Sequence, residues 1–273
     1  MNSWLLIILR GVLRAGIWLM DQGLEVGQIT VNDIVFLKDD LSFEKPQIID
    51  CLVTGRRKGH PNTYLKSVAE MIKSKFTKGN PKLVEDNPII KSFVKCLEGH
   101  GRTLHGKKNN TRQEYRLLEH PLFLSLAQHC VFNDRVRDEF RNKHCSIFRS
   151  LDVYCVLDGS SKKSRQYPAS EGWKRLFKQR SSPGVMQAQL NVHGEKYQGG
   201  LVPDLVKIFR DTSAHVTGSI PPARQVITPE DRKDAGKPIT QEIIGKYIKI
   251  IGPHLLSYLF ESYGTCDTED KLR

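Results

Sequence analysis

The sequence predicts a mainly α-helical protein with a two-lobed architecture, a basic middle segment and at most a small β-hairpin. Apolar residues recur three and four positions apart in several separate segments, as one buried face of a helix requires. These segments are separated by a Lys-Gly-Asn-Pro turn at 78–81, a loop rich in Gly, Asn, Lys and His at 99–111, and a long proline-containing loop at 211–239. At 273 residues and 39% hydrophobic composition, the chain is long enough to bury a sizeable core.

The N-terminal segment, residues 4–20, is the most apolar stretch of the chain and reads WLLIILRGVLRAGIWLM. Arg10 and Arg14 interrupt it, and their spacing of four places them on one narrow face of a helix. The uncharged run before Arg10 is too short for a signal peptide, and both arginines oppose a membrane span. We expect a helix packed in a core or on a partner, with contact to a membrane interface as the alternative.

The first lobe is assigned to residues 1–100. After the N-terminal segment it contains one segment of ambiguous secondary structure and one short predicted helix. Residues 28–38 fit either a short strand or a helix beginning at Asn32. Residues 43–55 are predicted to form a short helix, with Pro46 in its first turn and Gly55 after its end.

Two clearer helices follow in the same lobe. The first spans 64–76, where Leu65, Val68 and Ile72 share one face after a cap at Asn62 or Thr63. The second begins at Asn87-Pro88 and ends near Gly99.

The middle segment, 101–183, begins after a glycine-rich and basic loop. One helix is predicted from Pro121 to Phe132 and a longer one from Asn133 or Asp134 to about Leu157. The C-terminal segment, 184–273, is predicted to carry a small hairpin, a helix at 202–210 and a long loop. A final helical region at 240–264 is expected to kink or split at Pro253.

Positive charge is concentrated in the middle of the chain. The net charge is +12, and residues 101–180 contain 17 Lys and Arg against 8 Asp and Glu, a net +9. The segment before it is net +3, and residues 181–273 are neutral. A concentrated block of this kind creates a local field that attracts polyanions, whereas solvated surface charge is the plain alternative.

The stretch 159–183 combines seven basic residues and one acid with aromatic residues. Cations neutralise phosphates and release counterions, and an interleaved aromatic ring can stack an unpaired base. Burial of Trp173 and Phe177 in an amphipathic helix is the alternative. The candidate nucleic-acid-binding residues are Arg135, Arg137, Arg141, Lys162, Lys163, Arg165, Tyr167, Trp173, Lys174, Arg175, Lys178 and Arg180.

These observations favour a non-enzymatic protein that binds DNA or RNA by its phosphate backbone, and self-association is a further expectation. The first alternative is a DNA strand-cutting and strand-joining enzyme of the tyrosine recombinase kind, with Tyr258 or Tyr263 as nucleophile. The second is a peripheral membrane or scaffold protein that uses residues 4–20.

We expect no cofactor, metal or catalytic residue. The pairs His129-Cys130 and His144-Cys145 lack the spacing of zinc sites, and Pro203-Asp204 has no strand-borne partner carboxylate of the nuclease type. The six cysteines, spread over more than 200 residues without a CxxC pair, predict reduced thiols and an intracellular protein, in nucleus or cytoplasm.

Overall fold

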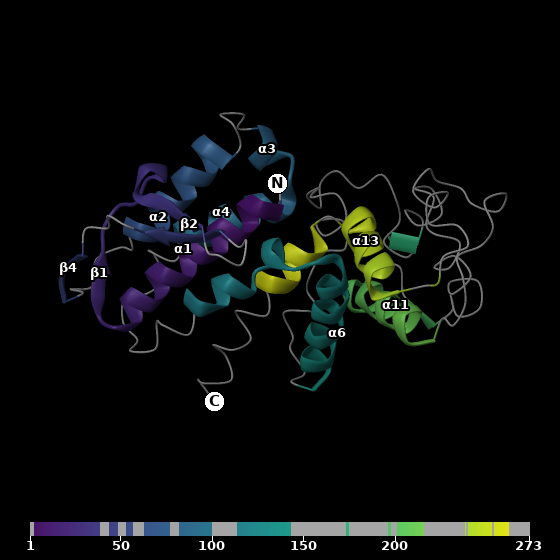
Figure 1. The fold of residues 1–273 in the computed structure, drawn as a ribbon. Helices are drawn as coiled ribbons and strands as arrows, with labels where there is room; N and C mark the ends of the chain where they lie inside the picture. The colour runs from purple at the N-terminus through teal and green to yellow at the C-terminus, as the bar shows by residue number, and fades with distance from the viewer. Residues whose placement is uncertain are drawn as a thin grey trace. The chain divides into compact units, whose positions relative to one another are not determined.

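The fold is known from a computed structural model and is mainly α-helical, as predicted. The chain divides into two compact units, Met1–Phe123 and Leu124–Arg273, which are described separately here (Figure 1). The structure describes residues 3–38, 44–48, 53–56, 63–76, 82–99, 114–142, 173–174, 196–197, 201–215, 238, 240–252 and 254–261. The predicted boundaries at 100 and 183 lie outside these residues. Of the hairpin predicted within 184–197, only Lys196 and Tyr197 are described, and neither is in a strand.

The first unit is built on helix α1 (Ser3–Asp21), whose one face is buried through Leu9, Leu13 and Ile17. Helix α2 (Thr63–Met71) packs closely against it, because Gly16 leaves room for the Tyr64 ring. The Tyr64 hydroxyl donates a hydrogen bond to the carbonyl of Val12. The predicted core packing of the N-terminal segment is therefore confirmed. Within the described residues, no helix is sufficiently long and apolar to cross a membrane.

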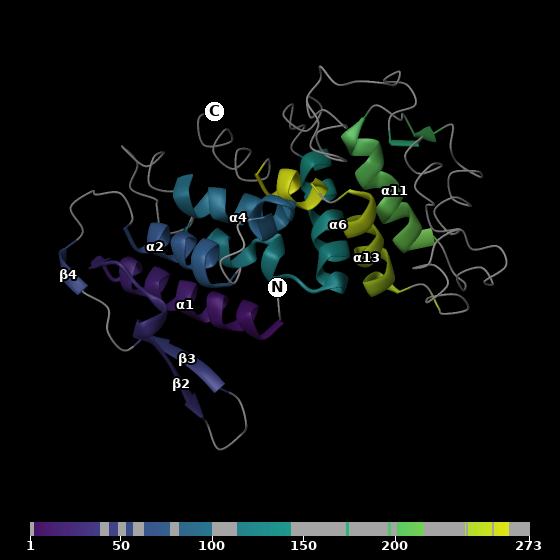
Figure 2. The ribbon, with the colours of Figure 1, turned by 90° about the horizontal axis from the view of Figure 1, so that it is seen from above.

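Two pairs of short antiparallel strands follow α1. Strand β1 (Leu24–Val26) pairs with β4 (Val53–Arg56), and β2 (Ile34–Lys38) pairs with β3 (Glu44–Ile48), the latter side by side in Figure 2. A single 3₁₀ turn, Val31–Asp33, precedes β2. The ambiguous segment 28–38 is thus a capped turn followed by a strand.

The predicted helix at 43–55 is wrong, because β3 and the start of β4 occupy this segment. Pro46 lies within β3, opposite Phe36, rather than in a first helical turn. A two-stranded sheet leaves one edge of each strand unpaired, and a proline whose nitrogen faces that edge removes no ladder hydrogen bond. The β-branched residues Ile48, Val53 and Thr54 also favour strands.

The remaining helices of the first unit follow the predicted pattern. Helix α2 continues into a π-helical turn, Ile72–Phe76, and short helix α3 (Lys82–Glu85) precedes α4 (Pro88–Gly99). The Asn87 side chain caps α4 by accepting hydrogen bonds from the N–H groups of Ile89 and Ile90, at 3.1 and 3.2 Å. Both helices predicted between 64 and 99 are confirmed.

The second unit contains helices α6 (Leu126–Asn142), α11 (Val202–His215) and α13 (Gln241–Ile251), with α6 in contact with both others (Figures 1 and 2). Helix α13 approaches the start of α6 so closely that a Cβ at Gly245 would overlap the carbonyl of Leu126. It ends at Ile251, and residues 255–261 form a separate helical segment. The predicted split near Pro253 is therefore confirmed.

The predicted break between helices at Phe132–Asp134 is wrong, because α6 runs through these positions. Asn133 is fully buried, and its side-chain amide donates to the carbonyl of Val206 on α11, at 3.2 Å. Asparagine favours helix starts when its side chain bonds the local backbone. Here the Asn133 side-chain amide bonds a carbonyl on α11. The residue therefore lies inside α6 and does not begin a new helix.

Candidate nucleic-acid interface

Five of the predicted binding residues lie within the described part of the second unit. Arg135, Arg137 and Arg141 lie on α6, and Trp173 and Lys174 are helical. The other seven candidates, Lys162, Lys163, Arg165, Tyr167, Arg175, Lys178 and Arg180, lie outside the described residues.

The arginines of α6 differ in their exposure to solvent. Arg135 is exposed, whereas the Arg137 side chain is only 13% exposed. The Arg137 guanidinium lies 3.6 Å from the Asp138 carboxylate, so it is partly neutralised within its own helix. Of these two arginines, Arg135 is the more accessible to solvent.

Trp173 is fully buried and acts as an anchor of the second unit. Its indole N–H donates to the carbonyl of Leu201 at 3.2 Å, and its ring meets Tyr197 edge-on, with centroids 6.2 Å apart. The alternative reading of Trp173 as a core residue is confirmed. In this arrangement its ring is not available to stack a base, and Lys174 beside it is half-buried.

Tyr197 connects this anchor to charged residues on α11. Its buried hydroxyl donates to the Asp211 carboxylate at 2.9 Å, and the ammonium of Lys207 lies 5.4 Å from the centre of its ring. The Arg210 guanidinium bonds the other carboxylate oxygen of Asp211 at 3.3 Å. We call Tyr197, Lys207, Arg210 and Asp211 the α11 cluster.

Geometry makes Arg210 a preorganised cation. Its side chain is 37% exposed, while Asp211 is 12% exposed and held by Tyr197. An arginine fixed by one buried carboxylate has further N–H donors for a second anion. Lys207, three positions earlier, lies on the same side of the helix. The α11 cluster can therefore hold an anionic oxygen at the surface.

Polar side chains also lie where α6 packs on α11, next to the α11 cluster. Burial raises the pKa of Asp134, while a hydrogen bond from Asn133 and the charge of Arg210 lower it. The Cys130 thiol lies 3.6 Å from the Ser213 hydroxyl, and burial raises its pKa too. Cys130 and its neighbour His129 are both buried.

Sequence reasoning missed Lys207 and Arg210 because they lie in the segment whose charges cancel overall. Their spacing of three in an amphipathic helix was the available signal. The pairing of Tyr197 with Asp211, which holds Arg210 in place, has no local sequence signature.

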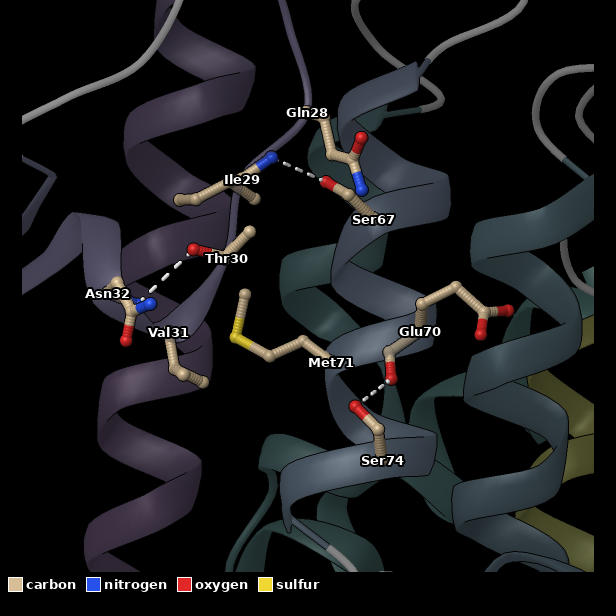
Figure 3. Close-up of a pocket in the computed structure, with 9 residues that line it drawn as sticks. All are labelled: Gln28, Ile29, Thr30, Val31, Asn32, Ser67, Glu70, Met71 and Ser74. Carbon is tan, nitrogen blue, oxygen red and sulfur yellow. Dashed lines mark hydrogen bonds between the residues drawn. The ribbon is translucent and has the colours of Figure 1, made fainter.

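A surface pocket in the first unit offers a different chemistry (Figure 3). Its volume is about 280 Å³, and Glu70 is the one charged residue among the described residues that line it. The Glu70 carboxylate accepts a hydrogen bond from the Lys73 ammonium at 3.0 Å. None of the predicted binding residues is among these lining residues. The lining residues are Gln28, Ile29, Thr30, Val31, Asn32, Ser67, Glu70, Met71 and Ser74.

The structure describes one of the two tyrosines considered for strand transfer. Tyr258 is half-buried in the helical segment 255–261, and Tyr263 lies outside the described residues. That reaction needs several cations converging on one phosphate beside the nucleophile.

In comparisons with known proteins, no protein-family model matches the chain, and no curated protein matches it.

Proposed function

We propose that this chain is a non-enzymatic nucleic-acid-binding protein that holds the phosphate backbone of DNA or RNA. The observation that carries the proposal is the charge of residues 101–180, where 17 Lys and Arg face 8 Asp and Glu. Bound cations release the counterions condensed on nucleic acid, which supplies affinity without reading the sequence.

The excess of positive charge is not spread evenly over residues 101–180. Residues 101–113 hold four basic residues and no acid, and residues 143–180 hold nine against three. Between them, residues 114–142 hold four arginines against five acids. We therefore assign the main contact to the two basic stretches on either side of residues 114–142, which are 101–113 and 143–180.

The α11 cluster adds a fixed point to this contact. Arg210 is held by a buried carboxylate and is over a third exposed, so little side-chain entropy is lost when it meets a phosphate. The aromatic residues among the candidate binding residues are Tyr167 and Trp173. Because Trp173 is buried, we propose Tyr167 as the residue that stacks a base.

Fluorescence anisotropy with labelled single- and double-stranded DNA and RNA, measured across a salt series, tests the proposal. We expect affinity to fall steeply with salt, and the preferred probe identifies the ligand class. Binding that does not change with salt, or no binding at low salt, contradicts it.

A charge reversal at Lys174, Arg175 and Lys178 to Glu is expected to abolish binding of the preferred probe. The matched control reverses Lys66, Lys91 and Lys95, three exposed lysines of the first unit, and is expected to bind normally. Thermal unfolding of both variants checks that they fold, because Lys174 adjoins buried Trp173. Equal loss in both variants would mean that overall charge, and not the basic stretch, binds the probe.

A further inference from the structure

The outward face of α1 carries large apolar side chains beside two cations. Trp4 is 44% exposed, Ile7 60% and Trp18 54%, and Arg10 and Arg14 are also exposed. At 3.6 residues per turn, these five positions lie along one side of the helix. We call them the tryptophan–arginine face.

This face is held outward by the packing of the opposite side. Leu9, Leu13 and Ile17 are fully buried, and Gly16 fits against the Tyr64 ring. Rotating α1 to hide its tryptophans would expose those core residues and break the hydrogen bond from Tyr64 to Val12. The apolar side chains therefore stay at the surface unless something covers them.

We propose that the tryptophan–arginine face docks on the surface of an anionic phospholipid membrane. Tryptophan favours the boundary between lipid headgroups and acyl chains, since its ring is apolar and its N–H needs a polar partner. Arginine bonds phosphate through several N–H groups. Asp21, at the end of α1, is the helix's one acidic residue, so the face complements a negative surface.

The contact is shallow and lies along the membrane surface. One side of α1 belongs to the protein core, so only the side chains of the other side can enter the headgroup region. Ile7 and Trp18, eleven residues apart, then enter at points about 16 Å apart along the axis.

Two other occupants fit the face less well. In an antiparallel pair of copies, Arg10 and Arg14 lie near the middle of the helix and would face the same arginines of the partner. A nucleic acid would gain two cations and two rings, but it offers no apolar surface for Ile7. A lipid surface satisfies all five side chains.

The three tryptophans supply a built-in measurement. Trp173 is fully buried, whereas Trp4 and Trp18 are exposed. Nuclease-treated full-length protein is mixed with vesicles of phosphatidylcholine alone, or with roughly 30% phosphatidylserine. We expect cosedimentation and a blue shift of tryptophan emission with the anionic vesicles only, and quenching of this emission by brominated acyl chains.

Paired variants separate the two parts of the face. Ile7→Ser with Trp18→Ser, and Arg10→Gln with Arg14→Gln, are each expected to weaken vesicle binding by about tenfold or more. The matched controls are Lys66→Gln with Lys95→Gln, which removes two exposed charges, and Val131→Ser, which removes an exposed apolar side chain. Both controls are expected to bind vesicles like the unaltered protein.

Several results would overturn the proposal. One is vesicle binding that survives both α1 variants but is lost when Lys174, Arg175 and Lys178 are reversed, because the basic stretch would then be the membrane contact. Another is a dimer in light scattering that dissociates in the Ile7→Ser, Trp18→Ser variant, since a second copy would cover the face. Nucleic acid that protects Trp18 from an aqueous quencher would name a third occupant. None of these results contradicts salt-dependent nucleic-acid binding, which the anisotropy measurement tests separately, so the two proposals fail independently.

Discussion

At the scale of single residues, the clearest departure from ordinary solution behaviour is His120 in the first unit. It is fully buried, its ring contacts Phe93 with centroids 4.9 Å apart, and its Nδ1 accepts a hydrogen bond from the N–H of Leu122 at 3.1 Å. Burial lowers its pKa from 6.5 to about 3. The folded state therefore holds His120 neutral where the unfolded chain protonates it.

This difference predicts a pH dependence of stability. Between pH 6.5 and about 3 the unfolded chain binds one more proton at His120 than the folded protein does. The protein's free energy of unfolding therefore falls as the pH falls, by about 1.4 kcal/mol per pH unit from this residue. Urea unfolding between pH 4 and 6.5 measures this slope. His120→Gln keeps an acceptor without the titration, and its slope is expected to be shallower by about that amount. Equal slopes would show that His120 titrates alike in both states.

A second residue-scale prediction concerns the α11 cluster and rests on the proposed function. Replacing Lys207 and Arg210 with Gln removes two cations, so the slope of log affinity against log salt should become shallower by about 1 to 2. The matched control is Lys246→Gln with Lys249→Gln on α13. An unchanged slope in the Lys207 and Arg210 variant would exclude the cluster from the interface.

At the scale of elements, close helix approaches at glycine organise both units. Gly16 brings α1 onto α2 through the Tyr64 ring, and Gly245 brings α13 onto the backbone of α6. The two cases differ in what a side chain would meet. A tyrosine ring can shift, but the Leu126 carbonyl is backbone at the start of a helix and cannot move alone.

Gly245→Ala is therefore expected to destabilise the protein by about 1 to 3 kcal/mol, because α13 must move away from α6. Gly99→Ala at the end of α4 is the control, since a Cβ there meets nothing within 4 Å. Alanine is the better helix former, so this control should be neutral or slightly stabilising. Urea unfolding compares the two, and equal stabilities would contradict the close approach.

At the scale of the whole molecule, the excess positive charge of the middle segment lies mostly outside the helices that the structure describes there. The net +9 of residues 101–180 arises outside 114–142, whose four arginines face five acids. The described helices of that region thus add little net attraction for a polyanion. A long-range field from the basic stretches would set the association rate and its salt dependence.

This division predicts an effect for the shorter basic stretch. Replacing Arg102, Lys107, Lys108 and Arg112 with Gln should make the salt slope for nucleic acid shallower by up to about 3 to 4. The control replaces Lys66, Lys82, Lys91 and Lys95, four exposed lysines of the first unit. Anisotropy across a salt series measures both. If the control alters the slope as much, net charge alone governs binding.

Local signals predicted elements well where one pattern was strong. The helices at 64–76 and 88–99, the core packing of the N-terminal segment and the split near Pro253 follow from periodicity, caps and proline. The prediction failed at 43–55, where Pro46 fits both a helix start and an unpaired strand edge. Pairing with β2, ten residues earlier, decided between them.

For the candidate site, too, some features could be predicted from the sequence and others could not. The sequence by itself determined where the positive charge lies, because composition does not depend on folding. Only the tertiary structure decided that Trp173 is buried, that Asn133 bonds α11 instead of starting a helix, and that Arg210 is held by Asp211 and Tyr197. The physical reason is that helix periodicity is a local property of the backbone, whereas burial and hydrogen-bond partners depend on residues distant in the chain.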